Sequence, residues 1–94
     1  MAKIEIEKIS EEKKAQLNIN TWPIWTKEVS KFDWHYDETE VCYILEGNVV
    51  ITTSDGSKIE IKAGDFVTFP KGLSCTWEVI EPIRKHYSFM HSTK

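Results

Sequence analysis

The chain has no long hydrophobic run and few cysteines, and these shortages exclude several classes of protein. No segment of its 94 residues approaches the ~18 consecutive apolar residues that a membrane-spanning helix needs. The first eight residues, Met-Ala-Lys-Ile-Glu-Ile-Glu-Lys, are charged where a signal peptide would be apolar, so we expect a cytoplasmic protein without a membrane partner. Cys42 and Cys75 are far apart and lack CxxC spacing, which argues against a zinc ribbon or a dithiol redox motif.

Basic residues are also too few and too scattered to form a nucleic-acid-binding surface. Twelve Lys and Arg stand against fifteen Asp and Glu, which gives a net charge of -3. No segment combines Lys and Arg with aromatic residues, so we expect no nucleic-acid partner. What the chain does have is aromatic residues, with four Trp, four Phe and three Tyr, and these make a compact core feasible in so short a chain.

The order of residue types predicts an all-β domain preceded by one short helix. Residues 10–18 predict that helix, because Ser10 can cap its start, acidic residues follow in the first turn and Asn18 stands near its end. From Trp22 onward, short runs of β-branched and aromatic residues alternate with turn residues. The predicted strands span residues 4–7, 24–29, 32–36, 41–45, 49–53, 58–61, 66–69, 75–79 and 84–90. Between two of them, Ser54-Asp55-Gly56-Ser57 predicts a tight hairpin turn.

Alternation along these strands places one acidic residue among inward-facing apolar ones. Successive side chains of a strand point to opposite faces of a sheet, so Cys42 and Ile44 face the interior if Glu40 does. The same alternation gives matching faces on two other strands, namely Phe32, Trp34 and Tyr36 on one and Cys75, Trp77 and Val79 on the other. The outer face of the 41–45 strand is apolar as well, so a helix, an N-terminal strand or a second subunit must cover it. We therefore expect a homodimer.

Several short motifs, in order, resemble one known family. They are Trp22-Pro-Ile-Trp25, Phe32-Asp-Trp-His-Tyr36, Glu40-Val-Cys-Tyr-Ile-Leu-Glu-Gly47, Gly64-Asp-Phe-Val-Thr-Phe-Pro-Lys-Gly72, Thr76-Trp-Glu-Val and Arg84-Lys-His-Tyr87. Together they are similar to the small cupins related to ethanolamine-utilisation cupins and to ureidoglycine aminohydrolase cupin domains. The resemblance implies a cupin jelly-roll β-barrel with turn glycines at Gly47 and Gly72. We expect one domain over 1–94, with a strand and a helix in 1–21 and the barrel in 22–90.

The resemblance also maps the metal ligands of cupins onto this chain. It places two histidine ligands at Trp34 and Tyr36, the glutamate at Glu40 and the third histidine at Cys75. A divalent metal needs about three strong protein ligands, and only Glu40 matches the pattern. His35 does not replace them, because it alternates to the opposite face. We therefore expect no metal and no other cofactor, the alternative being a weak site of Glu40, Cys75 and a last-strand residue. The metal-dependent activity of the ureidoglycine enzyme is not implied.

The interior residues predict a small-molecule pocket that is aromatic and singly acidic. Its expected lining is Trp34, Tyr36, Glu40, Cys75 and Trp77, with Lys85 and Tyr87 from the last strand, while Trp25 and Phe32 either extend it or belong to the core. Aromatic faces attract ammonium groups by ~0.5–2 kcal/mol each, and an unpaired buried carboxylate is costly until a cation joins it. The hypothesis is a small polar or nitrogen-containing metabolite, such as an amine, ureide or amino acid, anchored by Glu40.

Alternation does not decide which side chains of the last strand face this pocket. Either Lys85 and Tyr87 point inward or Arg84 and His86 do. The answer determines whether the carboxylate of Glu40 has a cationic partner inside the barrel.

Two functional alternatives stay open at this point. The protein could be a metal-independent enzyme by either of two routes. In one, Glu40 is the general acid or base of an isomerase, lyase or hydrolase. In the other, Cys75 is a nucleophile, although no histidine demonstrably shares its face. The barrel could also be a structural module for dimerisation or interaction, because its apolar outer face would support association.

Overall fold

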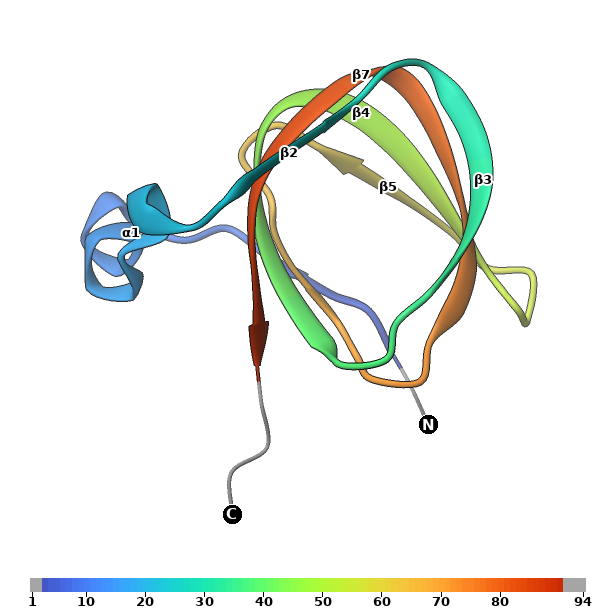
Figure 1. Ribbon diagram of the computed structural model, residues 1–94, viewed down its shortest axis with the longest axis horizontal. Coiled ribbons are helices and arrows are strands. Elements are labelled where there is room, and N and C mark those ends of the chain that lie inside the picture. The colour runs from blue at the N-terminus through green and yellow to red at the C-terminus, as the bar shows by residue number, and fades with distance from the viewer. Residues whose placement is uncertain (1–2, 91–94) are drawn as a thin grey trace.

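The computed structural model describes residues 3–90, apart from the side chain of Met90, and shows a β-barrel with one short helix outside it (Figure 1). Its elements are β1 (Glu5–Glu7), α1 (Glu11–Leu17), the 3₁₀ helix η1 (Ile19–Thr21), β2 (Ile24–Lys27), β3 (Ser30–His35), β4 (Thr39–Thr53), β5 (Lys58–Lys62), β6 (Phe66–Phe69) and β7 (Ser74–Met90). The all-β fold with a short N-terminal helix is confirmed. In the part of the chain described, no helix is long and apolar enough to cross a membrane.

Two long antiparallel strands, β4 and β7, pair with each other in the wall of the barrel, and each contributes one half to each of two sheets. The first half of β4 pairs with β6 and with the second half of β7, whose other edge pairs with β2. The second half of β4 pairs with β5 and with the first half of β7, whose other edge pairs with β3. The seven strands of residues 3–90 are hydrogen-bonded into one continuous sheet, whose two halves, β1-β6-β4-β7-β2 and β5-β4-β7-β3, face each other across the core and are called the two sheets below.

The sequence predicted β4 and β7 as four separate strands, and this division is wrong. Residues 41–45 and 49–53 are parts of one strand, as are 75–79 and 84–90. The break expected at Gly47 is a bulge, where the pairing of β4 with β7 shifts register between Ile44 and Val49. Pro82 lies opposite this bulge, where a missing N–H group is tolerated. The five other predicted strands lie within two residues of their observed bounds.

Gly47 is required at the bulge by its conformation and by its surroundings. Its φ is +105°, and a Cβ added there would stand 2.4 Å from the Pro82 carbonyl oxygen. The bulge also changes which side chains of β4 face inward. Before it the buried core residues are Cys42 and Ile44, and after it they are Val49 and Ile51, so that both halves of one strand contribute to the same core.

Helix α1 begins and ends as the sequence predicts. Ser10 caps it by accepting a hydrogen bond from the Lys13 N–H at 3.0 Å, and Asn18 ends it in the left-handed conformation, with φ of 57°. The segment from α1 to Trp22 then covers the outer face of β4 and β6. Buried in this second cluster are Ile19, Val41 and Phe66, with Ile9, Leu17, Trp22 and Tyr43 packed against them.

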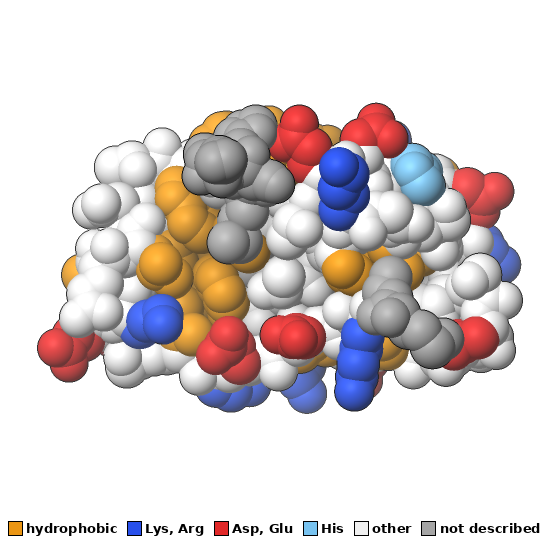
Figure 2. Space-filling view, turned by 90° about the horizontal axis from the view of Figure 1, so that it is seen from below, with side chains coloured by type: hydrophobic (Ala, Val, Ile, Leu, Met, Phe, Trp, Pro, Cys, Tyr) orange, Lys and Arg blue, Asp and Glu red, His pale blue; other side chains and the backbone are white. Residues whose placement is uncertain are grey.

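The outer face of β4 is thus covered by the chain's own helical segment. Seen from below, hydrophobic side chains gather on the left, the side on which α1 lies (Figure 2). The homodimer stays a prediction, which a light-scattering mass tests.

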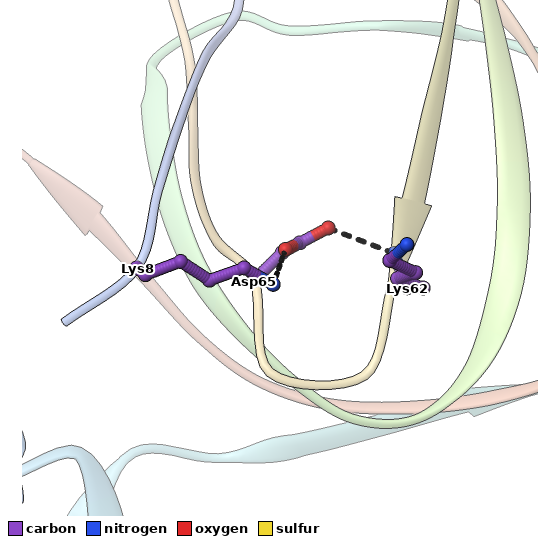
Figure 3. A network of polar contacts seen from close by, with 3 residues as sticks. All are labelled: Lys8, Lys62 and Asp65. Carbon is purple, nitrogen blue, oxygen red and sulfur yellow. Dashed lines mark hydrogen bonds and ion pairs between the residues drawn. The ribbon is translucent and has the colours of Figure 1, made fainter.

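A buried aspartate fastens the N-terminal segment to the barrel (Figure 3). Asp65, in the turn between β5 and β6, is 3% exposed and accepts hydrogen bonds from Lys8 Nζ at 2.6 Å and from the Lys62 N–H at 3.0 Å. One carboxylate therefore closes the turn and holds the segment between β1 and α1.

Candidate functional site

Inward-facing side chains enclose a cavity of about 210 Å³ between β2, β3, β4 and β7. It is lined by Trp25, Phe32, Trp34, Tyr36, Glu40, Trp77, Lys85, Tyr87 and Phe89. Seven of these nine residues are aromatic, and the other two are oppositely charged. Its volume is equivalent to about seven water molecules in the liquid, which suits a small metabolite.

The charged residues of the cavity are Glu40 and Lys85, and they form a buried ion pair. Lys85 Nζ donates a hydrogen bond to Glu40 Oε2 at 2.6 Å, and the two side chains are only 6% and 7% exposed. Both residues lie on strands that have a paired neighbour on each side, since Glu40 pairs with Phe69 and Phe89, and Lys85 with Trp25 and Ile44. The sheet therefore fixes the backbone positions from which both side chains project.

Aromatic rings surround the ammonium group of Lys85. Its Nζ lies 4.8 Å from the ring centroid of Trp77, 5.0 Å from that of Trp25 and 5.9 Å from that of Phe69. Each such contact favours the charged amine, and most when water is excluded. A cation therefore already lies among the aromatic rings of the cavity, and it is a side chain of the protein itself.

A stacked aromatic group forms one wall of the cavity. The ring of Tyr36 lies parallel to that of Phe69, with centroids 4.8 Å apart, and the Tyr36 hydroxyl accepts a hydrogen bond from Trp77 Nε1 at 3.2 Å. Burial, and next the negative charge of Glu40, raise the pKa of Tyr36 far above its ordinary value. Tyr36 therefore keeps its proton and is a poor base.

The mouth of the cavity is formed by two half-exposed aromatic residues. Trp34 is 50% exposed and Phe89 is 45% exposed, although both line the cavity. Tyr87 lies between the mouth and the ion pair on β7, and its hydroxyl has no hydrogen-bond partner within residues 3–90. A ligand would pass the Trp34 and Phe89 rings before it reached Lys85.

Cys75 is not among the residues that line this cavity. It pairs with Trp34 and Thr53 at the start of β7, belongs to the buried core and borders a wider, open hollow lined by residues of β3, β4 and β7. Burial, and next the charge of Asp33, raise the pKa of Cys75 to about 11. Burial likewise raises the pKa of Cys42, a core residue, to about 12. Both thiols are therefore weak nucleophiles at neutral pH.

The side chains at the cupin ligand positions do not suit a metal ion. The nitrogen of an indole such as that of Trp34 has no free lone pair, and the Tyr36 hydroxyl is held by Trp77. The Glu40 carboxylate already faces an ammonium group at 2.6 Å, and Cys75 lies outside the cavity. No group of three His, Cys, Asp or Glu side chains that could hold a metal occurs within residues 3–90.

Six of the seven ligand-binding residues suggested by the sequence line one cavity, and the structure decides the orientation of the last strand. Lys85 and Tyr87 face the cavity, whereas Arg84 is exposed, and His86 packs outside with its Nδ1 2.9 Å from the Trp22 carbonyl oxygen. Sequence reasoning missed Phe89. The alternation of Ile83, Tyr87 and Phe89 was the available signal, because it places Lys85 on the apolar face.

Comparison with known proteins gives a family and structural relatives. The model of the EutQ-like cupin domain matches residues 14–87. A crystal structure of a DUF861 family protein from Thermotoga maritima is 58% identical, with a TM-score of 0.92 over 94% of this chain and 100% of that one. Among more distant structures, a putative ethanolamine utilization protein Q from Salmonella typhimurium is 19% identical, with a TM-score of 0.67 over 96% of this chain and 71% of that one. At this identity, the similarity shows a shared fold and nothing more. No curated protein matches. With the family model and this close relative in agreement, the chain belongs to the EutQ-like cupin domain family.

Proposed function

We propose that this cupin binds a small polar or nitrogen-containing metabolite in the barrel cavity, and that the ligand is neutral or anionic. The observation that carries the proposal is the buried Glu40–Lys85 pair at the base of an aromatic cavity of about 210 Å³. Buried ion pairs contribute little net stability compared with apolar residues of the same volume. A pair that opens onto a cavity is better explained by recognition of a ligand.

The position of Lys85 argues for a change in the expected ligand charge. The sequence suggested an amine, a ureide or an amino acid anchored by Glu40, and left open whether Glu40 has a cationic partner. The Lys85 ammonium occupies the aromatic cage and neutralises Glu40. An amine ligand would have to displace it or accept a like charge nearby. An amide, a ureide or a carboxylate can instead accept a hydrogen bond from Lys85 and stack against the aromatic walls.

Fluorescence titration of the intact protein tests this proposal, since Trp25, Trp34 and Trp77 line the cavity. The panel compares benzamide, benzoate and benzylamine, which are similar in size and differ in charge, and adds allantoin, lactate and ethanolamine as small polar compounds. We expect saturable changes with neutral or anionic members and weaker changes with amines. Saturation by none of them, or tighter binding of the amines, would contradict the proposal.

A matched pair of variants locates the binding. Lys85→Met removes the hydrogen-bond donor inside the cavity, and Arg84→Met removes the neighbouring cation on the outer face of the same strand. We expect Lys85→Met to weaken binding about tenfold or more, as loss of a charged hydrogen bond does, and Arg84→Met to leave it unchanged. Equal effects would place the binding elsewhere.

A further inference from the structure

We propose that Lys85 is a nucleophilic amine that forms a reversible imine with small aldehydes or ketones in the cavity. The inference rests on the proposed function, because the carbonyl compound must first enter the cavity. It adds a covalent step that small-molecule binding alone does not require.

Lys85 differs from the other lysines in its surroundings. It is the one buried lysine of residues 3–90, and it faces a cavity with mostly aromatic walls. A lysine placed in an apolar pocket beside a proton acceptor is a known arrangement for attack on carbonyl carbon. The thiols do not compete, because Cys42 and Cys75 do not line the cavity.

Glu40 is placed to carry the proton in both directions. Its Oε2, 2.6 Å from Lys85 Nζ, accepts a proton and leaves a neutral amine beside a carboxylic acid. The amine nitrogen attacks the carbonyl carbon, and a proton moves from nitrogen to the carbonyl oxygen to give a carbinolamine. Glu40 then returns its proton to the hydroxyl group, the carbon–oxygen bond breaks, and water leaves. The sum is Lys85 ammonium plus carbonyl compound giving a protonated imine plus water.

The surroundings of Lys85 suit the product as well as the starting state. The protonated imine carries the same single positive charge as the ammonium, so no charge is created or lost in the cavity. The Glu40 carboxylate still neutralises it, and the rings of Trp25 and Trp77 still face it. A permanent ion pair with Glu40 would prevent Lys85 from acting as a nucleophile. In the proposed reaction the pair is broken only transiently, and the protonated imine and the Glu40 carboxylate form an ion pair again at the end.

Reductive trapping of the intact protein tests the inference. The protein is mixed at pH 7 with benzaldehyde or pyruvate and sodium cyanoborohydride, which converts an imine into a stable secondary amine. Peptide mass spectrometry then gives the initial labelling rate of each lysine. We expect Lys85 to be labelled about tenfold or more faster than exposed Lys31 and Lys58, as positioning beside a proton carrier implies. Labelling of Lys85 no faster than of these two would overturn the inference.

Two comparisons sharpen the result. Glu40→Gln should slow labelling at Lys85 and leave labelling at Lys31 unaffected, and circular dichroism shows whether the variant is folded. If the variant is unfolded, the ratio of the Lys85 and Lys31 labelling rates in the wild-type protein decides whether the imine forms. Benzyl alcohol and lactate are matched compounds without a carbonyl to attack at the corresponding carbon. If they bind in the cavity while Lys85 stays unlabelled, the imine is refuted and the proposed binding function stands. If no neutral or anionic member of the fluorescence panel binds and Lys85 stays unlabelled, both fail.

Discussion

Removal of Lys85 should destabilise the protein far more than removal of Arg84, the exposed cation next to it on β7. In Lys85→Met the Glu40 carboxylate, whose side chain is 7% exposed, loses the one side chain that donates a hydrogen bond to it within residues 3–90. Breaking a buried pair in this way lowers the free energy of unfolding by about 3–5 kcal/mol. For a domain whose total stability is about 5–15 kcal/mol, this is a large fraction.

A double-mutant cycle separates the pair from the packing of its members. Glu40→Gln together with Lys85→Met removes both charges, so we expect the double variant to be more stable than Lys85→Met alone, with a coupling energy of about 2–4 kcal/mol. The matched control is the Glu46–Arg84 pair of the same two strands, with atoms 3.7 Å apart and side chains 67% and 49% exposed. Glu46→Gln and Arg84→Met should couple by about 0–1 kcal/mol.

Urea denaturation followed by circular dichroism measures all these free energies of unfolding on one scale, provided that the free energy falls with urea concentration at the same slope in every variant. A coupling energy of the buried pair no larger than that of the exposed pair would show that burial does not strengthen the Glu40–Lys85 interaction. A Lys85→Met variant with the same urea midpoint of unfolding as the wild-type protein would contradict the predicted loss of stability.

Two further predictions concern the backbone and the thiols. Gly47→Ala should lower the free energy of unfolding by about 3 kcal/mol or more in the same assay, because it adds a clash with Pro82 to the strain of positive φ. The control is Gly56→Ala, where φ is +88° and nothing lies within 4 Å, and it should lower the free energy of unfolding by only about 1–2 kcal/mol. Equal losses in the two variants would show that the clash is unimportant. Cys42, with its pKa raised from 9.0 to about 12, keeps its proton in the folded state, so its contribution to stability is full below pH 9 and is lost as pH rises toward 12. Wild-type protein should therefore lose more stability than Cys42→Ala between pH 8 and 10.5, and parallel curves would disprove this. Iodoacetamide should accordingly label Cys42 and Cys75 slowly at pH 8 in folded protein and rapidly in urea.

The sequence predicted most of the fold because its local signals agree with one another. Ser10 and Asn18 mark the ends of α1, and Asp55-Gly56 marks the turn between β4 and β5. The bulge at Gly47 could not be predicted in the same way. A glycine there is compatible with a turn, and only the approach of the Pro82 backbone, 35 residues away in the chain, shows that the strand continues.

The site was predictable as a set of residues but not as an electrostatic arrangement. Alternation gathered Glu40, Tyr36 and Trp77 on the inner face, where they are found. The alternation of Ile83, Tyr87 and Phe89 indicates the inner face of β7, but which residue of that face lies beside Glu40 depends on the register of β7 on β4, and the sequence pattern does not reveal that register. The ligand charge inferred from Glu40 alone and the one inferred from the Glu40–Lys85 pair therefore differ, and the titration proposed above decides between them.

The sharing of β4 and β7 between the two sheets has a consequence for how the chain folds. Neither sheet can form alone, because each needs half of both strands, and their pairing joins residues as distant as Glu40 and Phe89. Folding must therefore wait for contacts between remote parts of the chain, which places its time constant in the range of milliseconds to seconds. Once formed, the strands should open as one unit, so that backbone amides of both sheets exchange with deuterium at a common slow rate.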